Sequence, residues 1–401
     1  MRFVGYFPQW GIYDRHYFVR DVHSSGQAAR LTHLTYAFGE LDESGRCVMT
    51  EEGTGDAWAD YQRRFSASES VDGRADKYEQ PLAGNLNQLR KLKARHPRLK
   101  IGISFGGWNA ARYFCNAALT PESRAAFASS AISLYFDGDL PVTGGEPQGG
   151  PGVAAGIFDL IDFAWEWPGC GGTDRHGDAS GVADRHDFTL LLAETRRQLD
   201  AFTRRTGRPV QMSAYLPADR ERVAAGIEPE IFRYLDFGIV QGHDFHGDWS
   251  LTTNHASQLY TPPDDPSPDR LSVDAGVLNY LEMGVPPAKL LVGIPGSGRG
   301  WRGVPDKQNG LYQQARAIAS GALGPGSEEY RSLARRPGER FRDDEYGAQW
   351  LYDGDEFWSY DDPQLVRQKA AYAKDLGLGG LSLWSLENDD AQGSLVRAMH
   401  G

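Results

Sequence analysis

Eight short runs of apolar, β-branched or aromatic residues recur along the chain, and patterns typical of helices lie between them. Such an alternation predicts a parallel sheet whose strands are joined by helices. Eight strands of this kind indicate an α/β fold, the (β/α)8 or TIM barrel. The expected strands cover residues 3–7, 31–38, 100–105, 157–165, 211–216, 237–241, 290–294 and 380–384.

Helix signals and one long connection complete the predicted organisation. Residues 84–96 have apolar positions at helical spacing, Thr120-Pro121-Glu122 opens a second helix with a hydroxyl cap and a first-turn proline, and a third begins near Asp187. The segment after the seventh strand is too long for one crossover helix and rich in aromatic residues, which predicts a small α+β insertion. We therefore expect a barrel at 1–301 and 356–401 and an insertion domain at 302–355.

Composition excludes several classes of protein. A net charge of -12 over 401 residues repels phosphate backbones, so nucleic acid is not an expected partner. No run of about 18 apolar residues predicts a membrane span. The chain enters a strand pattern at once, without a secretory leader, so it is expected to be cytoplasmic as written, or secreted if a leader was removed. Cys47, Cys115 and Cys170 are expected to be free thiols, and we expect a monomer without metal or cofactor.

The most informative polar residues lie in the predicted fourth strand, FDLIDFAWEWP at residues 158–168. Alternation along an extended strand sends Asp162, Ala164 and Glu166 to one face and Phe163 and Trp165 to the other. Sites in such barrels are built at the carboxyl ends of the strands, where this run ends. Two carboxylates are therefore expected at the barrel mouth, with a methyl group between them.

Seven motifs, in order, carry a resemblance to a known family: VGYFPQWGIY, YAF at 36–38, SFGGW, DLIDFAWEWP, HDFHG, GIPGSGRGW and GGLSLW. The chain resembles the family 18 glycoside hydrolases, the chitinases and chitinase-like proteins, over nearly its whole length. The family pattern D-x-x-D-x-D-x-E becomes Asp159, Asp162, Ala164 and Glu166, so its third aspartate is missing. His243 stands where the family has a tyrosine, and Ser297 replaces a second tyrosine.

The resemblance implies substrate-assisted chemistry, in which one carboxylic acid protonates the leaving oxygen and the substrate's 2-acetamido oxygen attacks the anomeric carbon. Glu166 matches that acid. Ala164 cannot stabilise the charge that develops on the acetamido group, and it removes a like charge that would help Glu166 stay protonated. His243 could donate to the acetamido oxygen, or it could be a structural histidine. A metal at His243, Asp244 and His246 is disfavoured by their parity.

Further residues receive roles through the same resemblance. Asp162 and Asp159 are expected to support the acid, although Asp159 has the wrong parity for the inner face. Trp384 is the expected floor for the reacting sugar. The expected substrate contacts are Tyr6, Trp10, Trp108, Trp167, Tyr215, Asp244, Arg299 and Trp384. Trp249 and Trp301 also follow predicted strands, and core packing is the alternative for every tryptophan in this set.

The function implied is a chitinase-like hydrolase that acts on β-linked N-acetylglucosamine glycans by substrate-assisted retaining hydrolysis, with weakened or altered activity. A carbohydrate-binding protein without hydrolysis would explain Ala164 and His243, but the retained Glu166 counts against it. A barrel recruited to other small-molecule chemistry is a third hypothesis. An engineered change at position 164 is a fourth, and the further departures at Gln241, His243 and Ser297 argue against it.

Overall fold

The structure is a computed structural model that describes residues 1–49, 56–169 and 183–401. All eight predicted barrel strands are present. Their order is β1-β17-β8-β7-β6-β5-β4-β2, and β1 also pairs with β2, which closes a parallel barrel. The short β3 (Cys47–Val48) adds an antiparallel edge to β2. The barrel strands are β1 (Arg2–Pro8), β2 (His33–Leu41), β4 (Lys100–Gly106), β5 (Leu160–Ala164), β6 (Gln211–Leu216), β7 (Phe237–Val240), β8 (Leu290–Pro295) and β17 (Gly380–Trp384).

The chain forms two compact units, and its path crosses from one to the other within β1 and β7. Unit 1 comprises residues 1–5, 217–220 and 239–401, and unit 2 comprises residues 6–216 and 221–238. The helices that begin before residue 239 are α1 (Val19–Ser24), α2 (Gly84–Arg95), α3 (Phe114–Leu119), α4 (Pro121–Ala131), α5 (Ala183–Thr206) and α6 (Arg220–Gly226). Helices α7 (Val273–Glu282), α8 (Tyr330–Leu333), α9 (Pro363–Asp375) and α10 (Ser394–Ala398) belong to unit 1.

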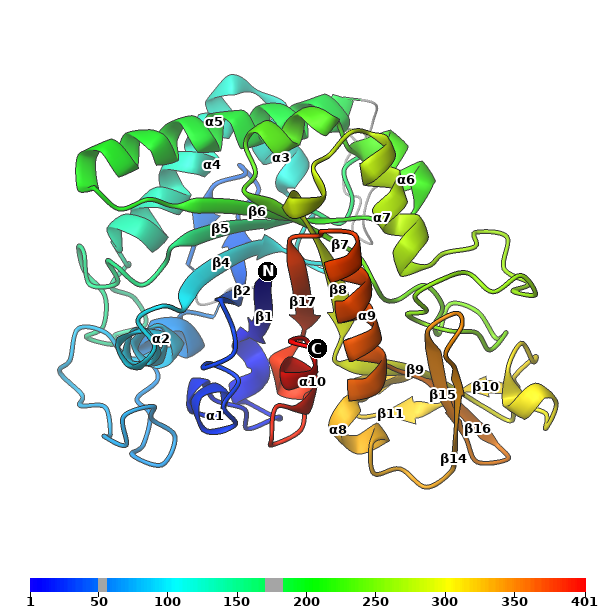
Figure 1. Ribbon diagram of the computed structural model, residues 1–401. Helices are drawn as coiled ribbons and strands as arrows, with labels where there is room; N and C mark the ends of the chain where they lie inside the picture. Colours follow the sequence, from blue (N-terminus) through cyan, green and yellow to red (C-terminus); the bar gives the residue numbers. More distant parts are fainter. Residues whose placement is uncertain (50–55, 170–182) are drawn as a thin grey trace. The chain divides into compact units, whose positions relative to one another are not determined.

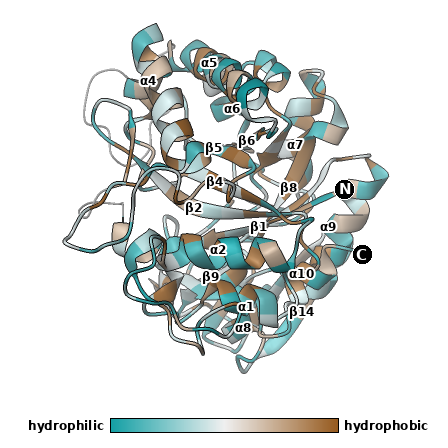
Figure 2. Cartoon of the chain, turned by 90° about the vertical axis from the view of Figure 1, so that its left-hand side faces the viewer, coloured by the Kyte–Doolittle hydropathy of each residue, from teal (hydrophilic) through white to brown (hydrophobic). Residues whose placement is uncertain are grey.

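In unit 2, α3, α4 and α5 lie together against the outer face of β5 (Figure 1). Phe163 of β5 packs against Phe114 of α3, Phe127 of α4 and Phe188 of α5, with ring centroids 5.6–6.3 Å apart. Figure 2 shows hydrophilic and hydrophobic residues mixed along α2 and α5, as expected for helices with one packed face. The apolar side chains of β5 therefore fix which residues of this strand point inward.

The predicted helix signals in unit 2 are confirmed. The segment expected at 84–96 is α2, and Thr120 caps α4 by accepting a hydrogen bond from the backbone N–H of Ser123 at 3.1 Å. Pro121 occupies the first turn of α4, as the sequence indicated. The described part of α5 already begins at Ala183, four residues before the predicted start.

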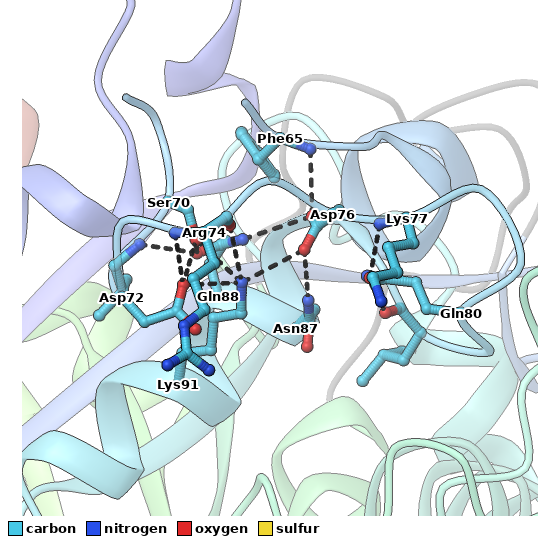
Figure 3. A network of polar contacts seen from close by, with 12 residues as sticks. Phe65, Ser70, Asp72, Arg74, Asp76, Lys77, Gln80, Asn87, Gln88 and Lys91 are labelled. Atoms are coloured by element: carbon cyan, nitrogen blue, oxygen red, sulfur yellow. Dashed lines mark hydrogen bonds and ion pairs between the residues drawn. The ribbon is translucent and has the colours of Figure 1, made fainter. Parts of the chain in front are cut away.

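The loop between the helical turn Trp58–Gln62 and α2 is held in place by one buried carboxylate, Asp76 (Figure 3). Its side chain is only 1% exposed and accepts hydrogen bonds from the backbone N–H of Phe65 at 3.0 Å and from Asn87 Nδ2 at 2.9 Å. Lys91 Nζ lies 3.3 Å from the same carboxylate and supplies the opposite charge. Since Asn87 and Lys91 belong to α2, Asp76 fastens the loop to this helix.

In unit 1, a second sheet follows β8. Its strand order is β11-β12-β13-β9-β16-β15-β14, and β10 pairs with β9. The predicted insertion at 302–355 falls inside this sheet, which begins at Ser297 and ends at Ser359 and contains the short helix α8. The strands are β9 (Ser297–Arg302), β10 (Ala317–Ile318), β11 (Ser320–Gly321), β12 (Gly324–Pro325), β13 (Ser327–Glu329), β14 (Glu339–Asp343), β15 (Ala348–Tyr352) and β16 (Glu356–Ser359).

Two smaller expectations concern the membrane and the cysteines. Across the described ranges, no helix combines the length and the apolar character needed to cross a membrane. Cys47 is buried and Cys115 is partly buried, and both are free thiols, as expected. Cys170 lies outside the described residues.

Candidate active site

The alternation predicted for β5 is confirmed by the surroundings of its side chains. Phe163 and Trp165 face the helices, and Trp165 stacks on Phe114 with ring centroids 5.5 Å apart. Asp162 faces the opposite way, where Tyr6, Ser104 and Ser213 surround it. Glu166 lies two residues beyond the end of the strand, and continued alternation predicts the same face as Asp162.

Asp162 is fully buried and accepts three hydrogen bonds from hydroxyl groups. Tyr6 Oη lies 2.9 Å and Ser104 Oγ 2.7 Å from Oδ2, while Ser213 Oγ lies 2.5 Å from Oδ1. The two serines sit beside Asp162 in the register of β4 and β6. Burial raises the pKa of Asp162, although the three hydroxyl donors oppose that shift.

The charge of Glu166 acts on the phenol of Tyr6. The pKa of Tyr6 is raised well above its usual value, first by burial and then by the charge of Asp162, and Glu166 contributes as well. Glu166 is half-buried. Asp162 of β5, Glu166 just beyond the end of this strand and the phenol of Tyr6 in β1 therefore interact electrostatically within unit 2.

Two residues beside this cluster, Ala164 and Gly106, have little or no side chain. Ala164 is 4% exposed, and its neighbour in the register of β4 is Gly106. Gly106 has a φ of +100°, and a Cβ atom on it would lie 2.5 Å from the carbonyl oxygen of Ala164. Glycine is therefore required at this position, and it leaves Ala164 next to a residue without a side chain.

The aromatic residues predicted to bind substrate divide into two groups in unit 2. Trp10 is 43% exposed and Trp108 is 49% exposed, so each offers a ring to solvent after β1 and β4. Trp167 is 2% exposed and stacks on the half-buried Tyr215, with ring centroids 5.4 Å apart. The first pair has rings free to stack on sugar, whereas Trp167 supports Tyr215 from within the protein.

Asp159 is not part of the cluster, contrary to its predicted role in supporting the acid. It precedes β5, at the end of the strand opposite to Glu166. Both of its oxygens contact Lys93 Nζ, at 2.6 and 2.7 Å, and Oδ2 also accepts the backbone N–H of Ile101 at 3.0 Å. The opposite parity noted in the sequence explains this position, because no bulge turns Asp159 inward.

Unit 1 contains a second polar cluster, centred on Asp244. Arg299 Nε donates to Asp244 Oδ1 at 2.8 Å, and His243 Nδ1 lies 3.1 Å from Oδ2. Although burial opposes it, the charge of Arg299 together with the hydrogen bond from His243 holds the pKa of Asp244 well below its usual range. The guanidinium of Arg299 also lies 5.4 Å from the ring of Trp249, which is 59% exposed. Asp244 is therefore a firmly ionised acceptor, and His243 is held by it.

The other candidate residues of unit 1 are Trp384, Trp301 and His246, and each has different surroundings. Trp384 ends β17 and is half-buried. Trp301 is fully buried in the core of the second sheet, with Trp350 and Phe357, so core packing is correct for this tryptophan. His246 donates from Nδ1 to the carbonyl of His255 at 2.7 Å, which makes it a structural histidine. Throughout the described ranges, no three His, Cys, Asp or Glu side chains are grouped as metal ligands.

The sequence alone did not identify two residues of the cluster, Ser104 and Ser213. Ser104 and Ser213 each donate to Asp162, yet short hydroxyl residues in apolar strands give no signal by themselves. Their parity was available, since each falls on an inward position of its own strand. Only the register of β4, β5 and β6 shows that these positions adjoin Asp162.

The fold is a parallel (β/α)8 barrel whose fourth strand carries Asp162, with Glu166 just beyond the end of this strand. This arrangement is that of a class of enzymes that cleave glycosidic bonds. The sequence model described as glycosyl hydrolases family 18 matches residues 2–389. The chain therefore belongs to glycosyl hydrolase family 18.

Relatives of known name agree with this assignment. The chain is 34% identical to Chitinase C of Streptomyces lividans over 400 residues, which cover 98% of this chain and 58% of that protein. It is 33% identical to Chitinase 63 of Streptomyces plicatus over 402 residues, covering 99% of this chain and 59% of that protein. The chain thus spans less than two thirds of the length of either relative.

Solved structures extend the likeness to the fold. The catalytic domain of psychrophilic chitinase B from Arthrobacter TAD20 is 41% identical, with a TM-score of 0.93, and the match covers 99% of this chain and 94% of that one. A family 18 N-acetylglucosaminidase from Paenibacillus barengoltzii is 27% identical, with a TM-score of 0.75, and the match covers 100% and 98% of the two chains.

Proposed function

We propose that the chain is a chitinase-like hydrolase that cleaves β-linked N-acetylglucosamine glycans, with Glu166 as the general acid. The observation that supports this proposal is the electrostatic interaction of Glu166 with Tyr6, whose phenol donates a hydrogen bond to the buried Asp162. The named relatives that are chitinases support the substrate class.

The reaction proceeds in two steps. Glu166 donates its proton to the glycosidic oxygen, the bond from this oxygen to the anomeric carbon breaks, and the acetamido oxygen of the same sugar attacks that carbon. The resulting oxazolinium ion is opened by water, which gives its proton to the carboxylate of Glu166 and thereby restores the acid. Two displacements at one carbon return the original anomeric configuration.

Asp162 and Ala164 determine how well this reaction is supported. The hydroxyls of Tyr6, Ser104 and Ser213 hold Asp162 in one orientation, with its oxygens fully engaged. Ala164 offers no hydrogen-bond acceptor to the acetamido N–H, so the positive charge of the oxazolinium lacks a nearby partner at this position. We therefore propose a hydrolase of weakened activity, for which His243 compensates in part at most.

A second candidate function is oligosaccharide binding without turnover, and the specific observation in its favour is Ala164. The exposed rings of Trp10 and Trp108 would serve binding and hydrolysis equally well. The two functions differ only in whether Glu166 transfers a proton.

The substrate test compares the N-acetylglucosamine tetramer with its fully deacetylated counterpart. Because the nucleophile belongs to the acetamido group, we expect chromatography to show shorter products from the acetylated tetramer alone. Equal cleavage of both sugars would contradict substrate assistance. Binding of the acetylated tetramer without any product, measured by calorimetry on the same sample, would favour the non-hydrolytic candidate.

A further inference from the structure

A closed ring of buried hydrogen bonds surrounds Asp60, which lies in the helical turn Trp58–Gln62 of unit 2. Gln9 Nε2 and Tyr36 Oη each donate to Asp60 Oδ1 at 2.5 Å. Asn85 Nδ2 closes the ring by donating to Tyr36 Oη at 3.1 Å and to the backbone carbonyl of Gln9 at 3.2 Å. All four residues are at most 4% exposed, and they come from four different segments of the chain.

Within the part of the chain that the structure describes, no cationic side chain forms an ion pair with Asp60. Gln9 and Tyr36 both donate to the same oxygen, Oδ1, so a proton on the other oxygen is compatible with both hydrogen bonds. Burial raises the pKa of Asp60 from 3.8 to about 7, the two hydrogen bonds oppose this shift, and the like charges of Asp56 and Glu40 add to it. The phenols that face Asp60 are Tyr36, Tyr13 and Tyr135.

Asp76 provides the contrast within the same unit. Its side chain is also buried, at 1% exposed, but Lys91 and several N–H donors surround it (Figure 3). A buried carboxylate persists as an ion where such partners exist, whereas one without a cation is favoured in its neutral form. The two residues therefore form a natural pair, one with an ionic partner and one without.

The ring acts directly on the segment that carries Trp10. Gln9 and Trp10 are the first two residues of the short 3-10 turn Gln9–Ile12, which follows β1. The side chain of Gln9 is held by Asp60 and its carbonyl by Asn85. The ring of Trp10 lies 6.0 Å from Phe38 and is 43% exposed. Because Gln9 directly precedes Trp10, a change at Asp60 that moves Gln9 would also move the tryptophan.

We propose that Asp60 is a positioning residue for Trp10, holding the Gln9–Ile12 turn in place through this closed ring of buried hydrogen bonds. The consequence for sugar binding rests on the proposed function, in which the exposed ring of Trp10 stacks on the glycan. The consequence for the turn itself does not depend on that function.

The direction of the pH effect follows from linkage. The folded protein keeps a proton on Asp60 up to a pKa of about 7, whereas the unfolded chain loses it near 3.8. The stability contributed by this proton is complete below the unfolded value and is lost as the pH rises through the folded value. Above that pH, the turn must accommodate a buried anion beside Asp56 and Glu40, so we expect it to loosen.

The test that is independent of catalysis uses protein labelled with 5-fluorotryptophan, with the Trp10 resonance assigned by its loss in Trp10→Phe. In the native chain, we expect its 19F shift to titrate with a midpoint near pH 7. In Asp60→Asn, which keeps the acceptor oxygen but cannot ionise, the shift should not depend on pH. A Trp10 resonance that is constant in the native chain, or titrates unchanged in Asp60→Asn, overturns the proposal.

Asp76→Asn is the matched control, because it neutralises the other buried carboxylate of this region. It should lower thermal stability yet leave the titration of the Trp10 resonance in place. If Asp76→Asn abolished the titration as completely as Asp60→Asn, the effect would be one of general destabilisation, and the proposal would be wrong.

The kinetic test separates positioning from chemistry. Between pH 6 and pH 8, the KM of the native chain for the tetramer should rise about threefold or more relative to Asp60→Asn, with an unchanged ratio of kcat values. A fall in the kcat ratio instead would assign Asp60 to the chemical step. If neither protein hydrolyses the tetramer, the proposed function fails, and the 19F titration still decides the role of Asp60.

Discussion

Replacing Glu166 with glutamine is expected to lower kcat for the N-acetylglucosamine tetramer by about 10²–10⁴-fold, the range supplied by a positioned general acid. Glutamine has nearly the same shape but no proton of suitable acidity to give to the leaving oxygen. Because only the transition state needs that proton, the dissociation constant for the tetramer should stay nearly unchanged. Initial rates and calorimetry on the same preparation measure the two quantities.

Asp159→Asn is the matched control for this change, since it converts another carboxylate of the same segment into an amide. Asp159 pairs with Lys93 at the other end of β5, so its replacement should leave kcat within about twofold. A Glu166→Gln variant that retained full activity would remove Glu166 from the mechanism. An Asp159→Asn variant as inactive as Glu166→Gln would show that Asp159 does support the acid.

Introducing an aspartate at position 164 is expected to raise kcat for the tetramer by roughly 10²–10³-fold, the effect typical of one preorganised electrostatic group. The new carboxylate would follow Asp162 by two residues along β5 and would therefore lie on the same face of the strand. It would accept the acetamido N–H, stabilise the oxazolinium charge, and raise the pKa of Glu166 by like-charge repulsion. Initial rates as a function of pH measure both effects.

Ala164→Asn separates charge from hydrogen bonding at the same position. Asparagine can accept the acetamido N–H but carries no charge, so it should recover only a small part of the gain. An aspartate variant that binds the tetramer, unfolds cooperatively and is no faster than the native chain would contradict the role assigned to this position. In that case, the weak point of the site would lie elsewhere.

The sequence predicted the barrel well because buried parallel strands are continuous apolar runs with clear boundaries. The predicted strands at residues 211–216 and 380–384 coincide with β6 and β17, and the other six differ by a few residues at their ends. The second sheet was harder to delimit. Its strand β9 follows β8 after a single residue, so a sequence pattern extends the barrel through Trp301, whereas pairing with β13 and β16 places that strand in the second sheet.

The site was predictable where alternation along one strand decides the outcome, and not where pairing between strands does. Alternation along the predicted fourth strand assigned Asp162 and Glu166 to one face and Asp159 to the other. It could not show that Ser104 and Ser213 adjoin Asp162, because register is a property of three strands together. Asp60 gave no signal either, since its burial depends on Gln9, Tyr36 and Asn85, which are distant in the sequence.

The most direct measurement of the central claim is the anomeric configuration of the first product, followed by proton NMR during cleavage of the N-acetylglucosamine tetramer. Protonation by Glu166 with attack by the acetamido oxygen predicts that the β-anomer appears first and then equilibrates slowly with the α-anomer. Initial release of the α-anomer would show direct attack by water and contradict the account.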